Sequence, residues 1–142
     1  MAGRILAVDL GFRRVGTALS DPLGLTAQGG PVFSREEAGE DFLWALPPVL
    51  ELVEREGVSE VVVGMPRRLR GEEGVMAREA RRFAEALQKA GVKAVLFDER
   101  WTTKEAERIL LEGDLSRRKR KRVRDRVAAI LLLQTYLERR RP

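Results

Sequence analysis

Histidine and cysteine are both absent from this chain of 142 residues. Their absence excludes disulfides, cysteine nucleophiles, Ser-His-Asp triads and histidine general bases, and it leaves little basis for a zinc site. Acid–base or metal chemistry must therefore rest on Asp, Glu, Lys, Arg or Tyr, and hard oxygen-binding ions such as Mg2+ remain open. Long apolar runs and a signal peptide are lacking too, so we expect a cytoplasmic protein with no membrane contact.

Strong positive charge is confined to one segment. Residues 117–126 contain eight Lys or Arg and one acid, Asp125, which gives a local net charge of +7 against +5 for the whole chain. The rest of the chain is nearly neutral, with a slight negative excess. A patch of this kind is typical of proteins that bind phosphate backbones, so we expect a nucleic-acid partner. The alternative is a solvated charge run on the flank of a helix.

The order of apolar segments predicts an α/β fold. Arg4–Leu10 and Val15–Ser20 read as a hairpin, and a third, weaker strand is expected near Pro31 to Ser34. Helices and buried strands then alternate, with predicted helices over Pro47–Glu56, Val75–Ala90, Thr102–Leu111 and Arg118–Glu138, and predicted strands over Val61–Gly64 and Val92–Phe97. This alternation implies a mixed sheet with a parallel portion and helices on both faces, in a single domain spanning residues 1–142.

Three acids are candidates for one site. Asp9 and Glu99 each follow a strongly apolar strand, and parallel strands that are neighbours would bring both to one edge of the sheet. Asp125 shares a helical face with a set of mostly apolar residues at spacings of three, four, seven and eleven: Ala128, Ala129, Leu132 and Tyr136. Converging carboxylates repel one another, and divalent cations remove that penalty while activating water for phosphodiester hydrolysis. We therefore expect Mg2+, with Mn2+ as an alternative ion.

Simpler structural interpretations of the same acids stay open. Asp9 could anchor the turn at Gly11, and Glu99 could pair with Arg100 or Arg13. Asp125 could pair with a basic neighbour on its own helix, Arg122 or Lys121, an interaction worth only about 0.3–0.5 kcal/mol. The three acids together, beside a basic patch, favour the metal site.

Basic side chains that could contact phosphate occur in three segments. They are Arg13 and Arg14 beside Asp9, then Arg67, Arg68 and Arg70 in a Gly-rich loop, and Arg120, Lys121 and Arg122 in the basic run. Trp101 could stack on an unpaired base, but we favour a half-buried packing role for it.

These residues form a collinear pattern that resembles the YqgF family, also called RuvX. The matching elements are Asp9-Leu-Gly11, Ser20-Asp21, Val63-Gly-Met-Pro66, Asp98-Glu-Arg-Trp-Thr-Thr103, and Asp125 with Gln134-Thr-Tyr136. The resemblance covers nearly the whole chain, and the Asp98–Thr103 element is its most specific part. The chain departs from the family pattern after Pro66, where Arg67–Arg70 replaces a polar loop that often contains Asn.

The resemblance implies an RNase H-like fold whose five-stranded mixed sheet has its first three strands antiparallel. It also implies a metal-dependent nuclease that matures the 5′ end of 16S ribosomal RNA, with Asp9, Glu99 and Asp125 as its acidic triad. Two alternatives remain: a resolvase acting on branched, four-way DNA junctions, and a non-catalytic nucleic-acid-binding factor in transcription or ribosome assembly. Ribosomal particles are a further candidate partner. No pattern indicates a dimer interface, which favours a monomer.

Overall fold

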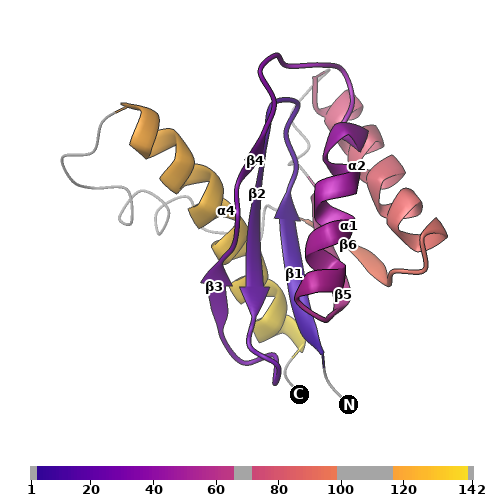
Figure 1. The fold of residues 1–142 in the computed structure, drawn as a ribbon, viewed down its shortest axis with the longest axis vertical. Coiled ribbons are helices and arrows are strands. Elements are labelled where there is room, and N and C mark those ends of the chain that lie inside the picture. The colour runs from indigo at the N-terminus through magenta and orange to yellow at the C-terminus, as the bar shows by residue number, and fades with distance from the viewer. Residues whose placement is uncertain (1–2, 66–71, 99–116, 141–142) are drawn as a thin grey trace.

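The computed structural model describes residues 3–65, 72–98 and 117–140, with the backbone alone for residues 72–73 and 117–126. Figure 1 shows a sheet between helices. Its elements, in chain order, are β1 (Arg4–Asp9), β2 (Arg14–Ser20), β3 (Ala27–Gly29), β4 (Phe33–Ser34), the 3-10 helix η1 (Leu43–Ala45), α1 (Leu46–Arg55), β5 (Val58–Met65), α2 (Glu72–Lys89), β6 (Ala94–Asp98) and α4 (Arg117–Arg140).

The sheet has the order β3-β2-β1-β5-β6. β1, β2 and β3 pair antiparallel, whereas β1 pairs parallel with β5 and β5 pairs parallel with β6. The short β4 lies off this path and pairs with the start of β2. The predicted mixed sheet of five strands, with three antiparallel strands first, is therefore confirmed, and β4 is an addition to it.

The third strand lies earlier in the chain than predicted. The segment near residues 31–34 contains only the two-residue β4, and the third strand of the main path is β3. β3 consists of Ala27, Gln28 and Gly29, which carry no β-branched or aromatic side chain. Backbone pairing with β2 holds it in place, as in the register of Ala18 with Gly29, so the sequence offered no apolar alternation to detect.

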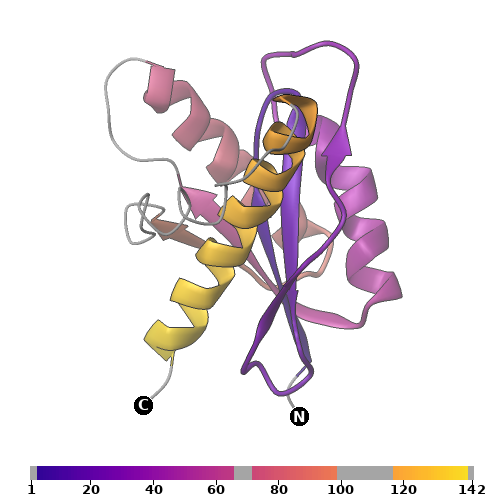
Figure 2. The same ribbon diagram turned by 90° about the vertical axis from the view of Figure 1, so that its left-hand side faces the viewer.

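Helices cover both faces of the sheet, as Figures 1 and 2 show. α1 and α2 pack on one face, where Val49 and Phe83 share a fully buried core with Leu6 of β1. α4 packs on the other face, where Leu132 and Leu133 join a second buried core. Because side chains alternate along a strand, successive residues of β1 belong to these two cores in turn.

The ends of α1 follow from local backbone chemistry. Pro47 and Pro48 lie in its first turn, where the missing N–H groups of proline cost no helical hydrogen bond. Gly57 ends it with a φ of 62°, a left-handed conformation that favours glycine, and Gly91 plays the same part after α2 with a φ of 86°. The helix predicted over residues 102–111 lies outside the described residues.

α4 is 24 residues long and combines a basic first half with an apolar second half. Among its described side chains, which begin at residue 127, Val127, Ala129, Leu132, Leu133 and Leu137 are buried. No helix in the described ranges has both the length and the apolar composition of a membrane span.

Candidate active site

Asp9 is the last residue of β1 and lies half-buried at the carboxyl end of this central strand. Ile5 and Ala7, which have the same parity along the strand, both belong to the core beneath α4. Strand alternation therefore places Asp9 on the face of the sheet that α4 covers. The carboxyl ends of parallel strands are where open α/β sheets usually bind ligands.

The position of Asp125 in α4 faces the same side of the sheet. Asp125 lies four residues before Ala129, seven before Leu132 and eight before Leu133, and these three residues are fully buried against the sheet. Spacings of four, seven and eight keep residues on one helical face. Asp125 therefore shares a helical face with residues that are buried against the sheet. Its side chain lies outside the described part, so its place in the site stays a prediction.

Small residues allow α4 to approach the sheet closely. Ala7 of β1, Ala18 of β2 and Ala129 of α4 are fully buried in one core, and their short side chains permit a close approach of helix and sheet. We expected this role from the pair Ala128 and Ala129. Ala129 is buried as expected, and Ala128 is half-buried.

Tyr136 fixes α4 to β5 through a buried carboxylate. Its hydroxyl group donates a 2.6 Å hydrogen bond to Oε1 of Glu60, and the ammonium group of Lys93 lies 3.0 Å from Oε2. The Tyr136 ring also meets Phe97 of β6 edge-on, with 5.4 Å between ring centres. We had placed Tyr136 in the core but had missed Glu60 and Lys93. The sequence did contain a signal for Glu60: it lies two residues before the buried Val62, so both side chains point to the same face of the sheet.

The electrostatics of this contact favour an ionised Glu60 and a neutral Tyr136. Burial raises the pKa of Glu60, but the hydrogen bonds from Tyr136 and Lys93 and the charges of Lys93 and Arg140 outweigh it, so this pKa lies below its ordinary value. Burial and the bond to the Glu60 carboxylate raise the pKa of Tyr136 to about 12.

The turn that follows Asp9 is held by its backbone carbonyl groups. Nε1 of Trp44 donates a hydrogen bond of 3.1 Å to the carbonyl of Gly11, and Nε of Arg35 donates one of 2.7 Å to that of Phe12. The backbone N–H of Arg35 donates a 3.0 Å bond to the carbonyl of Arg13. Three successive carbonyls of the β1–β2 turn are thus bonded to the segment between β4 and α1.

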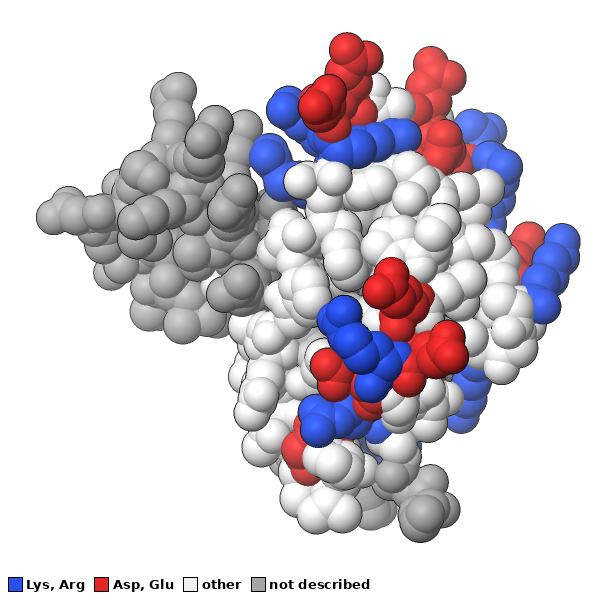
Figure 3. Space-filling view, in the orientation of Figure 1, with Lys and Arg blue, Asp and Glu red and all other residues white. Residues whose placement is uncertain are grey.

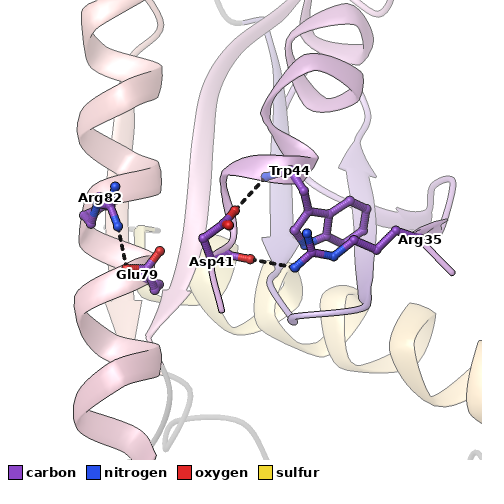
Figure 4. Close-up of polar contacts among 5 residues, drawn as sticks. All are labelled: Arg35, Asp41, Trp44, Glu79 and Arg82. Carbon is purple, nitrogen blue, oxygen red and sulfur yellow. Dashed lines mark hydrogen bonds and ion pairs between the residues drawn. The ribbon is translucent and has the colours of Figure 1, made fainter. Parts of the chain in front are cut away.

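Arg35 and Trp44 also hold each other, as Figure 4 shows. The guanidinium carbon of Arg35 lies 5.1 Å from the centre of the Trp44 ring, and Nη2 of Arg35 donates a 3.2 Å hydrogen bond to the carbonyl of Asp41. The Asp41 carboxylate caps η1 by accepting a 3.2 Å bond from the Trp44 N–H. We call Arg35, Asp41 and Trp44 the turn clamp. The sequence reasoning missed it, although an acid three residues before Trp44 is a helix-capping signal.

Glu79 is a second buried acid, but it lies away from Asp9. Its Oε2 pairs with Arg82 at 2.8 Å, and its Oε1 is buried without a hydrogen-bond partner in the described part of the chain (Figure 4). Glu79 belongs to α2, which covers the sheet face opposite to that of Asp9. It therefore contributes nothing to the candidate site.

The described residues bring together only part of the predicted site. Arg13 is exposed and Arg14 half-buried, both within five residues of Asp9. Glu99, Trp101, Arg67, Arg68, Arg70 and the side chains of Arg120, Lys121 and Arg122 lie outside the description. Within it, no three acidic side chains gather as metal ligands do, and two members of the predicted triad fall outside that search. The triad stays a prediction.

The described surface is mixed in charge. On the face drawn in Figure 3, Lys and Arg side chains are interspersed with Asp and Glu side chains. This mixture fits the nearly neutral body that we expected outside residues 117–126.

Known proteins resemble this chain along almost its whole length. The family profile described as "RuvX: Holliday junction resolvase" matches residues 3–139. A protein of Moorella thermoacetica named "Putative pre-16S rRNA nuclease" is 49% identical over 137 residues, which cover 96% of this chain and 95% of that protein. A protein of the same name from Listeria innocua is 44% identical over 136 residues, covering 95% and 97% of the two chains.

Solved structures confirm the predicted fold. RuvC of T. thermophilus, in complex with a Holliday junction substrate, superposes with a TM-score of 0.60 at 18% identity, covering 96% of this chain and 95% of that one. The Fowlpox virus resolvase, in complex with junction DNA, gives a TM-score of 0.57 at 13% identity, with coverages of 96% and 97%. At such identities the likeness shows the RNase H-like fold alone. The profile match and the relatives at 44–49% identity show more: this chain belongs to the RuvX family.

Proposed function

We propose that this chain is a metal-dependent endonuclease that matures the 5′ end of 16S ribosomal RNA from its precursor. One observation carries the proposal: Asp9 lies at the carboxyl end of the central strand, on the face covered by the helix whose basic half contains Asp125. A carboxylate site at the edge of a basic surface is suited to phosphodiester hydrolysis.

The donor set fits Mg2+ or Mn2+. These ions prefer oxygen ligands, and the chain offers carboxylates at Asp9, Glu99 and Asp125 and no histidine or cysteine. Asp98 is the last residue of β6 and lies four residues after Ala94, so both side chains point to the same face of the sheet. Ala94 belongs to the core beneath α1 and α2, on the face opposite to that of Asp9. Glu99, the next acid in the chain, belongs to the predicted triad. We therefore assign Glu99 rather than Asp98 as the second ligand.

The roles of the chain's own residues follow from this placement. Asp9, Glu99 and Asp125 would hold the ions, which when bound lower the pKa of a water molecule and neutralise charge on the phosphate. Arg13 and Arg14, in and after the turn beside Asp9, would bind the phosphate at the site. The remaining candidates would hold the flanking backbone: Arg67, Arg68, Arg70, Arg120, Lys121 and Arg122.

The names of the relatives support precursor ribosomal RNA as the substrate, since both proteins described above are named for pre-16S rRNA. The description of the family profile supports a second candidate, resolution of four-way DNA junctions. Junction resolvases need two symmetric cuts and therefore usually a dimer. We favour the RNA substrate and a monomeric protein.

The test offers a 16S precursor fragment and a four-way junction side by side to the purified protein with Mg2+. We expect RNA cleavage in the wild type and a loss of at least about 100-fold in Asp9→Asn, because bound metal contributes several kcal/mol to such reactions. RNA binding should persist in this variant.

The matched control is Asp21→Asn, which removes one carboxylate charge at the far end of the hairpin. Asp21 caps the β2–β3 loop by accepting hydrogen bonds from the backbone N–H groups of Leu25 and Thr26, at 2.7 and 2.6 Å. It should cleave RNA as the wild type does. Equal cleavage by Asp9→Asn would refute the site assignment, and cleavage of the junction alone would establish the second candidate instead.

A further inference from the structure

Asp9 lies between two glycines on the face of the sheet beneath α4. In the antiparallel pair of β1 and β2, Asp9 is directly opposite Gly16. In the parallel pair of β1 and β5, Val8 is level with Val63, so the next step brings Asp9 level with Gly64. Gly64 is in turn level with Phe97 of β6. Four neighbouring strands thus contribute a row in which the two positions beside Asp9 carry no side chain.

All four positions point to the same face. Ala18 of β2, two residues after Gly16, belongs to the core beneath α4. Val62 of β5, two residues before Gly64, belongs to the same core, as do Ala7 before Asp9 and the partly buried Phe97 itself. By alternation, a side chain at position 16 or 64 would stand beside the Asp9 carboxylate on each side.

Backbone conformation does not explain these glycines. In the described part of the chain, the glycines with positive φ are Gly24, Gly57 and Gly91, and neither Gly16 nor Gly64 is among them. Glycine inside a strand costs about 0.5–1 kcal/mol relative to alanine, and it often marks a place where a ligand or another backbone approaches closely. β2 and β5 therefore each contain a locally unfavourable residue at the position next to Asp9.

Glycine at positions 16 and 64 means that neither strand places a side chain beside the Asp9 carboxylate, where a cation site requires room. Residues paired across neighbouring strands have Cβ atoms about 5 Å apart, so a Cβ at either position would crowd an ion held by Asp9. Mg2+ demands six oxygen ligands at about 2.1 Å and usually retains several water molecules, so its shell extends well beyond a single carboxylate. Phosphate oxygens that join the shell need space as well.

We propose that Gly16 and Gly64 are positioning residues that keep the sheet surface on both sides of Asp9 free for a hydrated divalent cation and the phosphate oxygens it binds. The proposal rests on the metal-dependent function proposed above. Gly64 gives the cleaner test, because α4 packs mainly over β1, β2 and β3, so the small size of Gly16 also serves helix packing.

The experiment compares Gly64→Ala with Gly29→Ala, a matched control in the exposed edge strand β3. Mn2+ binding is measured by electron paramagnetic resonance, and thermal unfolding is measured without metal. We expect Gly64→Ala to retain or exceed the wild-type unfolding temperature, since alanine suits a strand better than glycine. Its Mn2+ affinity should fall at least about 10-fold, the scale seen when residues supporting a metal site are changed. Gly29→Ala should leave the affinity unchanged.

Each other outcome contradicts the proposal. Wild-type Mn2+ affinity in Gly64→Ala would show that the space is not needed, and a wild-type protein that binds no Mn2+ would remove its basis. A large drop in unfolding temperature, or failure to fold, would show that packed protein fills the space. RNA cleavage reports on the proposed function separately. A wild type that binds Mn2+ through Asp9 without cutting RNA would refute the nuclease proposal alone, and normal cleavage with normal metal binding in Gly64→Ala would refute this inference alone.

Discussion

At the level of single residues, Tyr136 is a polar contact between α4 and the sheet. Its hydroxyl group donates a hydrogen bond to the carboxylate of Glu60, a residue that is only 6% exposed. Hydrogen bonds to charged groups contribute about 1.5–3 kcal/mol, more than bonds between neutral groups. Loss of the Tyr136 hydroxyl group should therefore weaken the attachment of α4 to the sheet.

We predict that Tyr136→Phe lowers the free energy of unfolding by about 2 kcal/mol at pH 7, because it removes this bond and keeps the ring. The control Thr135→Val removes a hydroxyl that bonds only within α4, to the carbonyl of Leu131. Urea unfolding of the three proteins measures the difference. Equal stability of wild type and Tyr136→Phe would mean that the bond contributes nothing.

The stability that the Tyr136–Glu60 hydrogen bond contributes should depend on pH. The pKa of Glu60 is lowered in the folded protein, so its stabilising effect is complete above its ordinary value of 4.5 and is lost as the pH falls through the lower, folded value. The gap between wild type and Tyr136→Phe should narrow below about pH 4. A gap that stays constant down to pH 2 would contradict an ionised Glu60.

Single residues also show what the sequence could and could not reveal. Asp9 was predictable because an acid after an apolar strand marks a strand end, and the structure places it there. The parity of Glu60 with Val62 was a signal of burial, but its partner Tyr136 is 76 residues away and could not be read from the local sequence. Gly64 lies in the family element Val63–Pro66, but the place of Gly16 and Gly64 beside Asp9 depends on the register between strands, which the sequence does not state.

At the level of elements, the turn clamp joins the segment before α1 to the turn after β1. The clamp residues lie more than twenty positions from the turn, so long-range contacts hold the turn together with its own Gly11, where a Cβ atom would lie 2.5 Å from the Arg14 carbonyl oxygen. Elements with strong periodicity, such as β1 and α4, were predicted nearly to their ends. β3 and the clamp were not, because both are defined by long-range backbone contacts rather than by local side-chain patterns.

We predict that Trp44→Phe loosens this turn without unfolding the protein, since it keeps the ring and removes one hydrogen bond, worth about 1 kcal/mol. Hydrogen exchange of the Arg35 and Gly39 N–H groups, which bond to turn carbonyls, should accelerate several-fold. The matched control is Gln88→Leu, which removes a side-chain bond to the carbonyl of Ala94 elsewhere. Unchanged exchange in Trp44→Phe would show that the clamp is redundant.

At the level of the whole molecule, the charge is divided between a mixed body and one basic helical segment. The described face carries both signs interspersed, while residues 117–126 carry a net charge of +7. Binding to a polyanion should then depend on this segment far more than on the total charge. The segment lies on the element that also carries Asp125, so binding and the proposed chemistry share one helix.

We predict that changing Arg120, Lys121 and Arg122 together to Gln reduces the slope of log K against log salt for RNA binding by about 2, since each phosphate contact contributes about 0.7 for single strands. The matched control changes Arg78, Arg81 and Lys89 to Gln. These three are exposed on α2, on the other side of the sheet. Equal slopes in the two triple variants would show that only net charge matters.

The sequence of α4 gives salt two opposite effects on this protein. No acid lies in its first turn, so the positive end of the helix dipole meets a cluster of like charges, with Arg118 and Arg122, and Arg122 and Arg126, one turn apart. Dissolved ions screen this repulsion between like charges, so added salt should stabilise the helical conformation at the start of α4. The same ions compete with the helix for phosphate and weaken RNA binding. If RNA is the substrate, as proposed, its phosphates would supply counter-charge to this segment, and RNA binding should order the start of α4 most clearly at low salt.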